Sequence, residues 1–209
     1  MASDPAERSE FVRRGRRLEY FTIFWNSLEA LAALIAGVIA GSVALVGFGL
    51  DSVIEVTSGA AVLWLLHRDN NAQRRQAADQ RTLRIVGSCF LALSAYVAYD
   101  SLHSLLGREA PARSVLGIMI AAASLIAMPL LAREKRRIGI ALGSAAMAAD
   151  ARQTDFCTYL SGILLGGLLL NAFFGMWWAD PLAGLVMVPL IAKEGIGGWQ
   201  GKNRCNECC

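Results

Sequence analysis

Long apolar segments separated by short polar ones dominate the pattern of this 209-residue chain. The segments are rich in Leu and Ala, are long enough to span a bilayer with about 20 residues each, and lack the period-two alternation of strands. Backbone groups inside a bilayer must be hydrogen-bonded within the segment, which favours helices. The pattern therefore predicts six membrane-spanning helices, at residues 19–40, 43–66, 85–106, 114–132, 144–171 and 177–193.

Composition and connections support an all-α, polytopic membrane protein with one transmembrane domain. Hydrophobic residues make up 55% of the chain and charged residues 18%, against about 25% charged residues in typical soluble domains. Only the residues AGS separate the first two apolar segments, so these two helices are expected to be antiparallel neighbours. We expect a cytoplasmic N-terminal segment (1–18), a six-helix domain (19–195) and a short cytoplasmic tail that contains cysteines (196–209).

Basic residues fall on one side of the predicted membrane. Of the 20 Lys and Arg residues, 17 lie at the termini or in the connections on the same side, two lie on the opposite side, and Arg152 lies within a span. The positive-inside rule then places both termini in the cytoplasm, as an even number of spans requires. Each basic cluster abuts a span, so lipid and not nucleic acid is the expected partner. One of these clusters is the connection between the fourth and fifth spans, which holds Arg133, Lys135, Arg136 and Arg137. The expected location of the protein is an inner or plasma membrane.

Two acids interrupt the second apolar segment. Asp51 and Glu55 are four residues apart, so both carboxylates project from one helix face, which they share with Gly47 and Ser58. A charged residue at the bilayer centre costs about 2.5–3.5 kcal/mol on insertion scales, and such residues usually face a partner or a cavity. We interpret the pair as a buried functional site; the alternative is two acids at the membrane interface.

The fifth apolar segment carries a second polar stripe. Asp150, Gln153, Cys157 and Ser161 follow one another at spacings of three, four and four, which keeps them on one face at about 100° per residue. Asp155 is expected to point away from this stripe, toward the side of Arg152. The alternative interpretation of Cys157 is an ordinary buried thiol that behaves as a small hydrophobic side chain.

Two further groups of residues are candidates for binding cations or protons. Asn26 and Glu29 share a face of the first segment, where Glu29 could line a cavity, carry a proton or make an interhelical hydrogen bond. The tail ends in a CxxC pair followed by one more cysteine, a spacing that suits a soft cation. The alternative for Cys205, Cys208 and Cys209 is a free tail in a reducing compartment.

Together the stripes favour a divalent cation as the cargo. Zn²⁺ accepts carboxylate oxygens and thiolates, and these ligands must lose protons to bind it, which couples cation movement to proton movement. No GxxxxGK[ST] motif occurs, which argues against an ATP-driven pump. We predict a secondary transporter that exports a Zn-like cation in exchange for protons, with a non-transporting metal binder or sensor as the alternative. An enzyme using Cys157 is not expected, because neither His67 nor His103 lies at its predicted depth.

The sequence resembles the cation diffusion facilitators. The stretch NSLEALAALIAGVIAGSVALVGFGLDSVIEVTSG is similar to the family's first helix hairpin, and WWADPLAGL resembles the start of its sixth helix. The resemblance implies that Asp51 and Glu55 are metal ligands and that the family's His-x-x-x-Asp pair falls on Gln153 and Cys157. An alternative register would place that pair on Ala151 and Asp155.

The resemblance also implies a homodimer. No prosthetic group is expected, and the Cys157 thiolate favours a softer transported cation, Zn²⁺ first, with Cd²⁺ or Co²⁺ as alternatives. Gln153 is a neutral ligand, so Asp150 or Glu29 is expected to complete the shell. The family's usual cytosolic C-terminal metal-binding domain has no counterpart of similar size after the sixth predicted helix.

Overall fold

The computed structural model describes residues 5–67 and 72–200, and every regular element in these ranges is a helix. The helices are α1 (Pro5–Ala40), α2 (Val43–His67), α3 (Ala72–Gly107), α4 (Val115–Leu142), α5 (Ala145–Phe174) and α6 (Ala179–Trp199). By length and composition, six helices of the described chain could each cross a membrane. The prediction of an all-α, six-span membrane protein is confirmed.

Three helices extend well beyond the apolar segments that predicted them, and one of these is α3, which begins at Ala72 and not at residue 85. Helix α1 begins at Pro5, before the predicted start at residue 19, and α4 continues to Leu142, past the predicted end at residue 132. The added stretches are rich in Arg, Gln, Glu and Lys, which are good helix formers. The helices therefore continue through these polar residues. Polar residues expected on connections therefore lie on helices.

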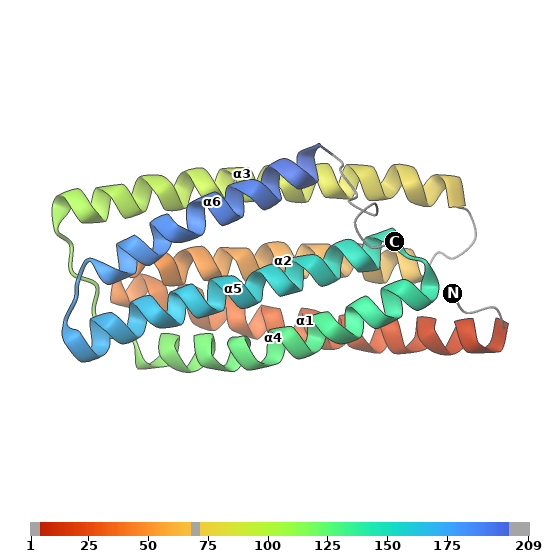
Figure 1. Cartoon of the computed structure of the whole chain (residues 1–209), viewed down its shortest axis with the longest axis horizontal. Helices are drawn as coiled ribbons and strands as arrows, with labels where there is room; N and C mark the ends of the chain where they lie inside the picture. Colours follow the sequence, from red (N-terminus) through yellow and green to blue (C-terminus); the bar gives the residue numbers. More distant parts are fainter. Residues whose placement is uncertain (1–4, 68–71, 201–209) are drawn as a thin grey trace.

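The helices pack as three pairs, α1 with α2, α3 with α6, and α4 with α5. In Figure 1 the α3–α6 pair lies on one side of the bundle, α1 and α4 lie on the other, and α2 and α5 run between them. Helix α2 contacts α5, and α1 contacts α4. The two helices that carry the predicted polar stripes are thus neighbours in the middle of the bundle.

Small residues bring the first two helices together. Gly41 ends α1 in the left-handed conformation, with φ of 64°, which a glycine adopts without steric cost. A Cβ atom added to Gly37 would lie 2.9 Å from the backbone nitrogen of Val46, so only glycine permits this spacing. The predicted antiparallel hairpin is confirmed.

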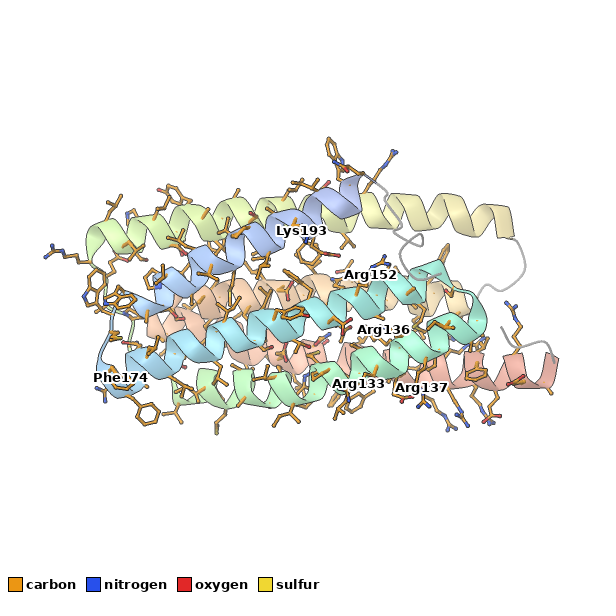
Figure 2. The ribbon with its side chains drawn as sticks, viewed as in Figure 1. Arg133, Arg136, Arg137, Arg152, Phe174 and Lys193 are labelled. Atoms are coloured by element: carbon orange, nitrogen blue, oxygen red, sulfur yellow. The ribbon has the colours of Figure 1, made fainter. Side chains whose placement is uncertain are left out.

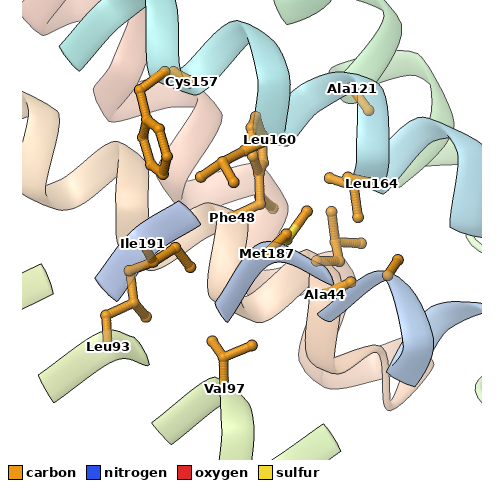
Figure 3. Close-up of a cluster of buried hydrophobic side chains, with 14 of the residues drawn as sticks. Ala44, Phe48, Leu93, Val97, Ala121, Cys157, Leu160, Leu164, Met187 and Ile191 are labelled. Carbon is orange, nitrogen blue, oxygen red and sulfur yellow. The ribbon is translucent and has the colours of Figure 1, made fainter. Parts of the chain in front are cut away.

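An apolar core fills the space between α2, α3, α5 and α6. Figure 3 shows Phe48, Val97, Leu160 and Met187 converging there, with Cys157 at the edge of the cluster. Polar side chains of α2 and α5 meet beside this core, since Thr154 donates to Glu55 and Ser58 donates to Asp150.

Charged side chains are distributed unevenly along the bundle. Figure 2 shows Arg133, Arg136 and Arg137 of α4, with Arg152 of α5, toward one end, whereas Phe174 lies at the other. The asymmetry expected from the sequence is therefore visible within the described helices.

Candidate cation-binding site

The two acids of α2 are buried between helices. Asp51 is 1% exposed and Glu55 is 0% exposed, so neither carboxylate lies on the lipid-facing surface. The 25-residue helix places them one turn apart on its inner face. This burial does not fit the alternative of two acids at the membrane interface.

Cys157 of α5 is the side chain from the second stripe that approaches both acids. Its thiol is fully buried and interacts with the carboxylates of Asp51 and Glu55. Gln153 precedes Cys157 by one helical turn, is 6% exposed, and its amide nitrogen has no hydrogen-bond partner in the described structure. The structure thus brings three of the four predicted metal ligands together and buries the fourth one turn away.

Several polar atoms at this place have no hydrogen-bond partner among the described residues. They are Oδ1 of Asp51, Oε2 of Glu55, and both side-chain polar atoms of Asn26, which lies near Glu55. The large majority of buried polar atoms in proteins are hydrogen-bonded, because an unpaired one is costly. Their concentration here marks a place built to bind something polar.

The ligand atoms are not already arranged around a point. In the described ranges, no group of three or more His, Cys, Asp or Glu side chains is placed to hold a metal ion. Binding a cation would therefore require Asp51, Glu55 and Cys157 to move toward one another.

A fully buried lysine lies next to this place. The ammonium of Lys135 on α4 is 2.5 Å from Oδ2 of Asp150, 3.2 Å from Oγ1 of Thr154 and 3.5 Å from Oε2 of Glu19. Lys135 and Glu19 are both 0% exposed. One ammonium thus faces carboxyl groups from α1 and α5.

The prediction that Lys135 belongs to a polar connection is wrong, because α4 continues past it and turns it into the bundle. The run REKRR resembles an ordinary cytoplasmic basic cluster. A signal was nevertheless present: Lys135 continues the spacing of three and four set by Met128, Leu131 and Ala132, which are all buried.

Asp150 is held by other residues and does not complete the predicted metal shell in this conformation. Oδ1 accepts a hydrogen bond from Ser58 at 2.9 Å, and Oδ2 accepts one from Lys135. Thr154 connects this cluster to the α2 acids, since its hydroxyl donates to Oε1 of Glu55 at 2.6 Å. Asp150 therefore belongs with Lys135.

Glu29 makes interhelical hydrogen bonds, which was one of the alternatives for it. Oε1 accepts from Ser52 of α2 at 2.6 Å, and Oε2 accepts from Ser124 of α4 and from the Trp25 indole at 3.1 Å. Both oxygens are thus used in joining three helices, which leaves Glu29 poorly placed to serve as a ligand.

Asp155 lies away from the α2 acids. It pairs with Arg136 of α4 and is partly exposed, while Arg152 is exposed and Ala151 is buried. The predicted direction of Asp155 is therefore observed, although its partner is Arg136 and not Arg152. The three tail cysteines lie outside the described residues.

Comparisons with known proteins agree with this fold. The cation efflux transmembrane domain matches residues 84–197, more than half of the chain. Transmembrane protein 163 of Xenopus laevis is 28% identical over 199 residues, which cover 92% of this chain and 68% of that protein. An uncharacterized transporter of Methanocaldococcus jannaschii is 26% identical over 183 residues, covering 82% of this chain and 62% of that protein. The chain belongs to the cation efflux transmembrane domain family, which supports a role as a cation transporter.

Proposed function

We propose that this protein exports a Zn-like divalent cation from the cytoplasm in exchange for protons. The observation that carries the proposal is the pair of unpartnered oxygens, Oδ1 of Asp51 and Oε2 of Glu55, buried beside the Cys157 thiol. Two carboxylates and a thiolate form a donor set that Zn²⁺ and Cd²⁺ accept. Gln153 and Asn26 would add neutral polar atoms at the edge of the site.

Proton exchange follows from the chemistry of these ligands. A carboxyl group or thiol must release its proton before it coordinates a metal, so cation loading and protonation of Asp51, Glu55 and Cys157 are mutually exclusive. Movement of α2 and α5 relative to their neighbours would expose the site to each side in turn, as in transporters with central sites.

The test is Zn²⁺ uptake into proteoliposomes with and without a pH gradient. Wild-type protein should show gradient-dependent flux, and Asp51→Asn/Glu55→Gln should abolish it. Asp155→Asn is the matched control, because it removes an acid from α5 that pairs with Arg136 instead of facing α2. Saturable Zn²⁺ binding without wild-type flux would instead identify a metal binder or sensor.

The topology and assembly are part of the proposal. The concentration of Lys and Arg on one side supports cytoplasmic termini in a cell membrane, and the family resemblance supports a homodimer. A cysteine introduced beside Arg108 should react with an impermeant thiol reagent added outside intact cells; no labelling would reverse the orientation. Light scattering of the purified protein at the mass of one chain would exclude the dimer.

A further inference from the structure

The ammonium of Lys135 is surrounded as a bound cation would be. Three oxygens face it, from Asp150, Thr154 and Glu19, at 2.5, 3.2 and 3.5 Å, and they come from two different helices. A lysine ammonium is a compact charge with three donors, so it can meet all three oxygens. Ser58 of α2 supports the arrangement by donating to Asp150.

Glu19 gives a second, independent sign of a cation site. Its side chain is 0% exposed, and neither carboxylate oxygen has a hydrogen-bond partner in the described chain; Lys135 is its ion-pair partner at 3.5 Å. The carboxylate lies against α2 where the helix has a glycine: a Cβ atom on Gly59 would be 3.1 Å from Oε2 of Glu19. A fully buried carboxyl group that has an ammonium as its ion-pair partner and accepts no hydrogen bond from a neutral donor is suited to bind a cation.

We propose that Glu19, Asp150 and the hydroxyls of Ser58 and Thr154 form a second divalent-cation site, which the chain fills with its own Lys135 ammonium. All the donors are oxygens, so without the lysine the site takes a hard cation such as Mn²⁺. The site differs from the one beside Cys157, where a thiolate favours softer cations.

The role of the Lys135 ammonium in this site rests on the proposed function, whereas the existence of the site does not. Thr154 contacts both the Lys135 ammonium and Glu55, so an ion bound in place of the ammonium would be held one hydroxyl away from the transport ligands. Lys135 is part of the chain and cannot leave, so it supplies a permanent positive charge beside Asp150 and Glu19 without retaining cargo. Cations then reach Asp51 and Glu55 without being trapped beside them.

The experiment compares Mn²⁺ binding to purified full-length protein by electron paramagnetic resonance. Lys135→Met keeps the length of the side chain and removes the charge, and it should bind one more Mn²⁺ per chain than wild type. Adding Asp150→Asn to this variant should remove the gained ion. Lys193→Met, which removes an exposed lysine from α6, is the matched control and should bind as wild type does.

Stability measurements keep the test decisive if the variant folds poorly. Lys135→Met leaves two buried carboxyl groups without a counter-charge, so its melting temperature should rise with Mn²⁺ and fall with EDTA, far more than that of wild type. Lys135→Met/Asp150→Asn should lose this dependence. Failure of Lys135→Met to fold even with Mn²⁺ present, or folded protein with no additional Mn²⁺, overturns the proposal. Absence of Zn²⁺ flux through the wild-type protein would overturn the proposed function alone, because the number of Mn²⁺ ions bound per chain is measured without transport.

Discussion

Glu29 offers a direct test of whether a buried acid in this bundle holds helices together or handles cargo. Its carboxylate accepts hydrogen bonds from Trp25, Ser52 and Ser124, which lie on α1, α2 and α4. Glu29→Gln keeps the shape of the side chain. Its carbonyl oxygen can accept from Trp25 and Ser124, while its amide donates to Ser52, whose own hydrogen can turn to the main-chain oxygen of Phe48 at 3.1 Å.

Glu29→Leu removes all three acceptor interactions at similar volume. Interhelical hydrogen bonds in membrane proteins contribute about 0.6 kcal/mol on average. Two of the three bonds join helices and the third, from Trp25, lies within α1, so at this value for each bond the three amount to about 2 kcal/mol. We therefore expect Glu29→Leu to lower the free energy of unfolding by about 2 kcal/mol and Glu29→Gln to change it by less than about 1 kcal/mol. The measurement is reversible unfolding in mixed micelles followed by circular dichroism.

Transport by the same two variants completes the test. If Glu29 serves only to join the helices, Glu29→Gln retains Zn²⁺ flux and its dependence on the pH gradient. A Glu29→Gln protein of normal stability without flux would refute this reasoning and assign Glu29 to cation or proton handling. A Glu29→Leu protein as stable as wild type would refute the energetic argument.

Three further variants test other parts of the structure. Cys157→Ser should weaken Cd²⁺ and Zn²⁺ binding while leaving Mn²⁺ binding little changed, and calorimetry showing equal losses for all three ions would contradict a soft-ligand role. Asp180→Ala removes the carboxylate that accepts from Ser42 at 2.5 Å at the start of α2; it should cost about 1 kcal/mol in unfolding free energy, and Ser42→Ala should add little to it. Gly184→Ala places a Cβ atom 2.4 Å from Oγ of Ser101 and should cost about 1–3 kcal/mol, which Ser101→Ala should partly restore; an unchanged melting temperature for Gly184→Ala would contradict the close packing of α3 and α6.

The spans and the α2–α5 pairing were predictable because both depend on regular spacing. The burial of Asp51, Glu55 and Cys157 against other helices could be predicted from the sequence, because polar residues at helical spacing in an apolar segment usually face protein. Their detailed neighbours could not be found this way. That Asp150 pairs with Lys135 while Asp155 pairs with Arg136 depends on the rotation of α4 about its axis, which local spacing does not determine.

Lys135 and Glu19 were missed for a physical reason. Each lies near the point where an apolar segment meets a basic one, and there the composition of the sequence indicates a connection. The backbone instead continues as helix, because Arg, Lys and Glu favour helix about as well as Leu does. Residues at such boundaries are then buried or exposed according to their helical phase. A search by phase that continued past residue 132 would have found Lys135.

The Thr154 hydroxyl has only one hydrogen, and this limits how Glu55 can be released. The Lys135 ammonium donates to its oxygen at 3.2 Å, so the hydrogen is free to point to Oε1 of Glu55 at 2.6 Å or to the main-chain oxygen of Asp150 at 3.2 Å. When Glu55 turns toward a cation, the hydroxyl can rotate to the Asp150 carbonyl and leave no unpaired donor. The Thr154 hydrogen therefore has two alternative acceptors, so in the proposed transport cycle Glu55 can bind and release a cation without leaving an unpaired donor behind.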